Sequence, residues 1–164
     1  MKILIVDDDE MMREMLKEML SRSGYTCITA VGSEGALCML ERAHFSIVVS
    51  DIRMPGLDGM GLLREIKEKH PDIDVISMTG YSKEYTFTDL IKAGASDFIT
   101  KPFSKDELEA KISRIVKERE LREKQRQAEA TLKAVRDELE QVNHQREQAL
   151  EKAHQPDGCQ RRER

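Results

Sequence analysis

Aspartates that follow apolar runs are the first residues of this sequence whose types and spacing could do chemistry. Asp51 follows the apolar run at 46–49, and Asp7 and Asp8 follow another apolar run at 2–6. A carboxylate at the end of a buried strand is costly unless something binds it, and neighbouring carboxylates need a cation if they are to stay ionised. A small cluster of hard oxygen ligands suits Mg²⁺, which keeps several waters and often bridges to a phosphate.

A hydroxyl and an amine follow two further apolar runs. Thr79 comes directly after the run at 74–78, and Lys101 follows the run at 96–99. A lysine supplies a point charge and a threonine supplies a hydrogen-bond donor, so together they suit a phosphoryl group held opposite the metal. Each of these signals is weak when taken alone, because acidic runs are common in solvated loops. The ordered set after four strands is what indicates a site.

The elements that must position these side chains follow from the spacing of apolar residues. Five short apolar runs alternate with helical patterns before residue 103. Four of these runs are those named above, and the remaining one lies at 25–29. We expect Ser33 to be the N-cap of the second helix, a helix to follow Asp58, and Gly94 to end the fourth helix. Strands made of continuous apolar residues are typical of a parallel sheet buried on both faces. The alternation predicts a doubly wound, five-stranded α/β fold, whose ligands bind at the carboxyl ends of the strands.

Composition excludes several classes of protein. The net charge of −4 over 164 residues argues against a chain built to bind nucleic acid. The three cysteines are an odd number without a paired spacing, as expected for reduced thiols in a cytoplasmic protein. The first residues lead straight into an apolar run and three aspartates, which is not a signal peptide, and no apolar stretch approaches membrane-spanning length.

Four stretches carry a resemblance to a known family: ILIVDDDE, VVSDIRMPGLDGMGLL, VISMTGY and AGASDFITKPF. Together they resemble the receiver domain of bacterial two-component response regulators, of the kind found in chemotaxis regulators, over about residues 2–116. The resemblance implies a flavodoxin-like sheet of strand order 2-1-3-4-5. It also implies that Asp51 accepts a phosphoryl group from a sensor histidine kinase or a phosphotransfer protein.

The resemblance assigns further roles around that aspartate. Mg²⁺ would be held by Asp7, Asp8 and Asp51 together with the backbone carbonyl of Arg53. Thr79 would hydrogen-bond the phosphoryl oxygens, Lys101 would pair with them, and the peptide between Lys101 and Pro102 would be cis.

A switch is also implied. The Thr79 hydroxyl would move toward the phosphoryl group, and Phe98, three residues before the lysine, would turn inward. The alternative is that Phe98 is simply half-buried on the fifth strand. Arg53 and Tyr81 flank the site and could tune hydrolysis of the phosphoryl group.

The chain changes character after Phe103, where a breaker-free, highly charged stretch begins. We expect a helix over 104–155, with Ser104 and Glu107 forming a capping box at its start. Residues up to 116 complete the receiver domain (1–116), residues 117–155 form a helical extension, and residues 156–164 form a disordered tail. Beyond the polar stretch 117–127 an apolar seam follows heptad-like spacing, out of phase with the preceding face. Its members are Ala128, Leu132, Val135, Leu139, Val142, Arg146, Ala149 and Ala153.

These patterns favour a response regulator that signals through protein contacts. The output would be a coiled coil that dimerises the chain or binds a partner helix, or the face made by the fourth helix, fifth strand and fifth helix. A solvated single helix is the alternative for the extension. We expect no direct nucleic-acid binding, because no helix-turn-helix pattern follows Phe103. We also expect no membrane insertion, because no apolar stretch approaches membrane-spanning length.

Three other functions are open at this point. A phosphatase of the haloacid dehalogenase class also uses a nucleophilic aspartate, but it needs a second aspartate where this chain has Arg53. The chain could instead be a constitutive coiled-coil scaffold. It could also be a receiver whose helix links it to an output domain in a longer protein.

Overall fold

The computed structural model describes residues 1–80 and 85–153, with side chains through residue 150. Five strands form one sheet in the order β2-β1-β3-β4-β5, and every neighbouring pair is parallel. This confirms the predicted fold class and strand order. The strands are β1 (Lys2–Asp7), β2 (Thr26–Val31), β3 (Ile47–Asp51), β4 (Asp74–Thr79) and β5 (Asp97–Thr100).

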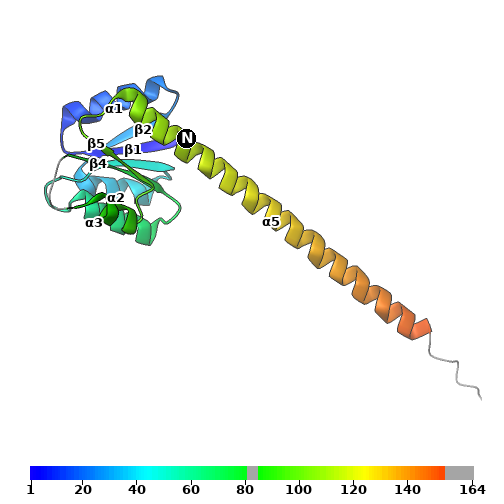
Figure 1. Ribbon diagram of the computed structural model, residues 1–164. Helices are drawn as coiled ribbons and strands as arrows, with labels where there is room; N and C mark the ends of the chain where they lie inside the picture. The colour runs from blue at the N-terminus through cyan, green and yellow to red at the C-terminus, as the bar shows by residue number, and fades with distance from the viewer. Residues whose placement is uncertain (81–84, 154–164) are drawn as a thin grey trace, which may run out of the picture. The chain divides into compact units, whose positions relative to one another are not determined.

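Five helices alternate with these strands. Helix α1 and the first turns of α5 cover one face of the sheet, and α2 and α3 cover the other (Figure 1). The helices are α1 (Glu10–Arg22), α2 (Gly32–Arg42), α3 (Gly59–Lys69), α4 (Phe87–Lys92) and α5 (Lys105–Ala153).

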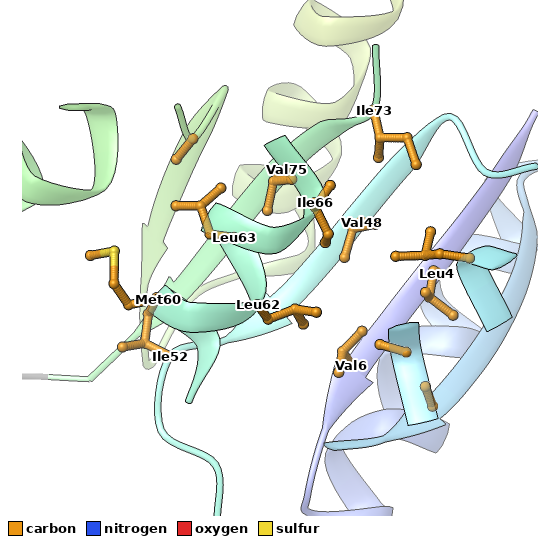
Figure 2. Packing of buried hydrophobic residues seen from close by; sticks show 14 of the residues in the cluster. Leu4, Val6, Val48, Ile52, Met60, Leu62, Leu63, Ile66, Ile73 and Val75 are labelled. Atoms are coloured by element: carbon orange, nitrogen blue, oxygen red, sulfur yellow. The ribbon is translucent and has the colours of Figure 1, made fainter. Parts of the chain in front are cut away.

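The core has two layers because successive residues of a strand point to opposite faces. In β1, Leu4 and Val6 face α2 and α3, whereas Ile3 and Ile5 face α1 and the start of α5. Figure 2 shows the first layer, in which α3 side chains such as Leu62 lie over the central strands. Strands β3 and β4 are buried at every position, as predicted for continuous apolar runs.

Polar side chains cap the N-termini of several helices, as the sequence suggests. Asp58 accepts a hydrogen bond from the backbone N–H of Gly61 at the start of α3, and the Ser104 hydroxyl accepts one from Glu107 at the start of α5. The prediction that Ser33 caps α2 is wrong. The helix already begins at Gly32, whose φ of +68° is open to glycine, so Ser33 lies inside the first turn with its hydroxyl buried and unpartnered.

Helix α5 runs without interruption from Lys105 to Ala153. The change of apolar phase after residue 116 is therefore a rotation of the apolar face along one helix. Two compact units divide at the same place, one of residues 1–116 and one beginning at Lys117. The segment expected to be a disordered tail, 156–164, lies outside the described residues. Within the part of the chain that is described, no helix is both long and apolar enough to cross a membrane.

Candidate functional site

Four strands deliver the predicted site residues to the carboxyl edge of the sheet. Asp7 ends β1, Asp51 ends β3, Thr79 ends β4, and Lys101 directly follows β5. Because the strands are parallel and adjacent in register, these ends meet at one place. The expected convergence therefore follows from strand order and strand length.

Three carboxylates form an acidic cluster at this edge. Carboxylate oxygens of Asp7, Asp8 and Asp51 all lie within 4.8 Å of one another. Asp7 is 1% exposed and Asp51 is 8% exposed, whereas Asp8 reaches solvent. The third aspartate of the run, Asp9, serves a different purpose, because it caps α1 by accepting hydrogen bonds from the next turn.

Lys101 lies between the two buried carboxylates. Its Nζ is 2.9 Å from Oδ2 of Asp7 and 3.0 Å from Oδ2 of Asp51. The backbone N–H of Lys101 donates to the carbonyl of Thr79 at 2.7 Å, and the peptide between Lys101 and Pro102 is cis. One ammonium thus faces three carboxylates, which leaves surplus negative charge in a largely buried place.

The electrostatics of the site reflect this imbalance. Burial raises the pKa of Asp51, the charge of Asp7 raises it further, and Lys101 only partly offsets the two effects. At Lys101 burial acts to lower the pKa, but hydrogen bonds and charge from Asp7 and Asp51 outweigh it and the pKa rises. A divalent cation among the carboxylates would relieve the surplus charge, so the donor set fits Mg²⁺.

Backbone groups fix the orientation of the carboxylates. Oδ1 of Asp51 accepts a hydrogen bond from the N–H of Ile52 at 2.8 Å, and Oδ1 of Asp7 accepts one from Asp9 at 2.9 Å. The guanidinium of Arg13, from α1, donates to the carbonyls of Asp7 and Asp8 at 2.9 and 3.0 Å. Sequence reasoning missed Arg13. The sequence feature that could have indicated this contact is the position of Arg13 one helical turn after Asp9, the N-cap of α1.

Gly59 allows α3 to start against the carboxyl end of β3. A Cβ at this position would lie 2.0 Å from the carbonyl oxygen of Asp51 and 2.7 Å from Cα of Ile52. The N–H of Gly59 also donates to the carbonyl of Ile52 at 2.9 Å. The Asp58–Gly59 pair therefore sets how closely α3 approaches Asp51.

The two expected switch residues lie in different surroundings. Thr79 is buried, and its hydroxyl donates to the carbonyl of Gly80 at 2.8 Å. Phe98 is half-buried on β5, and its ring stacks on Phe87 of α4 with centroids 4.2 Å apart. Nζ of Lys111 lies 5.5 Å from the Phe98 ring centroid. The stack with Phe87 was not predicted, because it depends on how α4 packs against β5.

Tyr85 joins the two loops beside the site. Its hydroxyl donates to Oδ2 of Asp58 at 2.8 Å, while Oδ1 of the same carboxylate caps α3. A shallow cavity of about 360 Å³ lies there, lined by Ile52, Arg53, Met54, Pro55, Asp58 and Tyr85. The Arg53 side chain is exposed. Tyr81, the other residue expected to flank the site, lies outside the described residues.

Comparisons with known proteins agree with this geometry. The sequence profile of the response regulator receiver domain matches residues 3–113. The chain is 40% identical over 116 residues to the probable transcriptional regulator ycf27 of Porphyridium aerugineum, covering 71% of this chain and 48% of that protein. It is 38% identical over 114 residues to the DNA-binding transcriptional regulator NtrC of Salmonella typhimurium, covering 70% and 24%. The crystal structure of a response regulator receiver domain protein from Clostridium thermocellum matches with a TM-score of 0.70 at 30% identity, covering 73% and 97%.

The chain spans about half the length of the ycf27 protein and about a quarter of NtrC. What it shares with them is the receiver portion, and the DNA binding in the name of NtrC is a property of that larger protein. Receiver domains accept a phosphoryl group and generally hold Mg²⁺ through acidic residues of the kind gathered here. The chain belongs to the response regulator receiver family of two-component signalling proteins.

Proposed function

We propose that Asp51 is the phosphoacceptor of this receiver domain. The observation that carries the proposal is the contact of Lys101 with both Asp51 and Asp7 at the centre of the acidic cluster. A carboxylate that is largely buried, oriented by a backbone N–H and held beside a fixed ammonium is a positioned nucleophile. The donor would be a phosphohistidine on a sensor histidine kinase or a phosphotransfer protein.

The transfer forms one bond and breaks another. An oxygen of Asp51 attacks the phosphorus, the bond from phosphorus to the histidine nitrogen breaks, and that nitrogen keeps the electron pair. Lys101 would pair with the phosphoryl oxygens, and the Thr79 hydroxyl, now bonded to Gly80, would turn to donate to them. Bound Mg²⁺, held by Asp7, Asp8, Asp51 and the carbonyl of Arg53, would stabilise charge on the transferring group.

The switch would run from Thr79 to Phe98. If the Thr79 hydroxyl moves toward the phosphoryl group, the space it leaves is available to the half-buried Phe98 ring. In the present state that ring is held by its stack on Phe87, so activation would break this contact. Hydrolysis of the acyl phosphate by water would return the site to its starting state. We expect the exposed Arg53, and Tyr81 by its position in the sequence, to tune the rate.

The output would pass through protein contacts. We assign residues 1–116 to the receiver domain, 117–155 to a helical extension that self-associates or binds a partner helix, and 156–164 to a tail. The exposed aliphatic side chains of the extension support this role. A linker to an output domain in a longer protein and a constitutive scaffold are the alternatives.

Intact-mass spectrometry after incubation with acetyl phosphate and Mg²⁺ tests the assignment. The wild-type chain should gain one phosphoryl group, and Asp51→Asn should gain none. Asp72→Asn, an aspartate outside the acidic cluster, is the matched control and should be labelled like the wild type. Labelling of Asp51→Asn to the wild-type extent would overturn the assignment. Turnover of a simple phosphate ester with rapid release of the product would instead favour a phosphatase.

A further inference from the structure

Helix α5 carries a row of exposed aliphatic side chains beyond residue 116. We call Leu121, Ala128, Leu132, Val135, Leu139 and Val142 the tail seam. Its leucines and valines are between 53% and 71% exposed, with Leu132 the most exposed. Leaving a row of this kind in water forgoes the favourable burial of apolar surface, so the row indicates a covering partner.

The spacing of the tail seam specifies the kind of partner. Steps of three and four residues place Leu132 and Leu139 at a positions of a heptad, and Val135 and Val142 at d positions. Leu121 and Ala128 continue the d positions toward the receiver domain. This repeat of 3.5 residues suits another long helix in a left-handed coiled coil.

We infer that the partner is a second copy of this chain, aligned parallel and in register. In this arrangement each aliphatic layer of the tail seam meets its own counterpart. The inference deepens the self-association proposed above and rests on it. It adds the orientation, the register and the number of copies.

Charge complementarity supports the parallel arrangement. Lys124 occupies a g position, and Glu129, five residues later, occupies the e position that follows Ala128. In a parallel pair, the residue at g of one helix faces the residue at the following e position of the other helix. Lys124 of each copy therefore faces Glu129 of the other, which gives two equivalent ion pairs. Nearer the receiver domain the in-register pairing is unfavourable, because Lys117 would face Arg122 and Glu118 at an a position would face Glu118. The favourable charge pairing therefore begins at Lys124.

The antiparallel arrangement is disfavoured by two other charged residues. The antiparallel register that pairs all four large central residues sets Leu132 against Val142 and Val135 against Leu139. In an antiparallel coil e faces e and g faces g, so Arg136 would meet Arg136 and Glu138 would meet Glu138 of the other copy. Like charges placed opposite one another are destabilising.

The number of copies follows from the polar residues at the a positions that flank the aliphatic layers. Leucine at a with a β-branched residue at d favours more than two strands. Here Gln125 and Arg146 occupy a positions on either side of the aliphatic layers. Their long polar side chains can reach solvent from a two-stranded coil but would be enclosed in a larger bundle. We therefore expect two copies, with the receiver ends of both helices at the same end of the coil.

Sedimentation velocity on the full chain over a range of concentrations tests self-association. The wild type should approach twice its chain mass of 18.8 kDa, and Leu139→Glu should remain a monomer. Lys133→Glu, which places the same charge at the outward b position, should still dimerise. A wild-type monomer at all concentrations, or a tetramer, would overturn the inference.

Charge exchange tests the orientation. Lys124→Glu alone and Glu129→Lys alone should each weaken the dimer about tenfold, because two attractive pairs become repulsive. Mixing the two variants should restore association as a heterodimer. Lys133→Glu is the matched control, since it also removes a lysine four residues after a glutamate. Restoration is specific to the parallel pairing, and its failure would overturn the parallel orientation.

Phosphorylation separates this inference from the proposed function. Acetyl phosphate should label Leu139→Glu as it labels the wild type, and far-ultraviolet circular dichroism checks that the helix persists. Dimerisation without labelling would overturn the assignment of Asp51 and leave the coiled coil intact. Labelling without dimerisation would do the reverse.

Discussion

Replacing Gly59 by alanine tests whether the start of α3 sets the position of Asp51. The new Cβ would lie 2.0 Å from the carbonyl oxygen of Asp51, and Cβ atoms in proteins essentially never make non-bonded contacts shorter than 3.0 Å. Relief therefore requires about 1 Å of movement between α3 and the end of β3. The obstruction is backbone on both sides, so no side chain can rotate away.

The expected loss of stability is about 2–3 kcal/mol. Overpacking of this kind costs roughly 1–3 kcal/mol, with rigid surroundings at the upper end, and alanine regains at most about 1 kcal/mol of helix propensity. For a domain of this size that corresponds to a fall of about 10 °C in Tm. Movement of Asp51 by about 1 Å away from Lys101 should slow phosphorylation by up to about 100-fold.

Urea unfolding followed by circular dichroism, and the rate of labelling by acetyl phosphate, measure the two effects. Gly61→Ala is the matched control in the same helix, because its Cβ meets the end of the Leu57 side chain, which can rotate. The control should change stability by less than about 1 kcal/mol. A Gly59→Ala protein with wild-type stability and wild-type labelling would refute the reasoning.

Three further predictions concern single side chains. Burial raises the pKa of Asp51 in the folded chain, so ionised Asp51 lowers the stability of the folded chain at neutral pH. In the absence of metal, Asp51→Asn should therefore raise the stability at neutral pH. This gain should vanish as the pH falls through the raised pKa of Asp51. Tyr85→Phe should lower stability by about 1 kcal/mol through loss of the hydrogen bond to Asp58, as measured by urea unfolding. Burial acts to raise the pKa of Asp97, but hydrogen bonds from Arg114 and Lys111 hold it below its ordinary value. At a pH above the ordinary pKa of an aspartate, Asp97→Asn should therefore lower the stability by about 1 kcal/mol. This loss should fade as the pH falls through the lowered pKa of the wild-type carboxyl, and urea unfolding at several pH values measures it.

The fold was predictable because the strands are continuous apolar runs. Strands β3 and β4 lie within one or two residues of their predicted bounds, since each has an abrupt polar end. Strand β2 is predicted as closely as β3, and it ends at Val31, two residues beyond Thr29. The cap at Ser33 was misplaced because the positive φ of Gly32 is invisible to a search for capping side chains.

The candidate site was predictable only where strand ends supply it. Asp7, Asp51 and Lys101 meet because the topology brings their strands together. Arg13 and Tyr85 were missed because their contacts depend on where a helix starts and how a loop runs. The stack of Phe87 on Phe98 was missed for the same reason, because it depends on how α4 packs against β5.

The central claim is that Asp51 carries the phosphoryl group, and direct mapping tests it. The full chain is incubated with acetyl phosphate and Mg²⁺ and reduced with borohydride, which converts an aspartyl phosphate to homoserine, and its peptides are sequenced by mass spectrometry. Homoserine at position 51 and at no other aspartate is the result that this account predicts. Homoserine at another aspartate, or none in a chain that has gained a phosphoryl group, would contradict it.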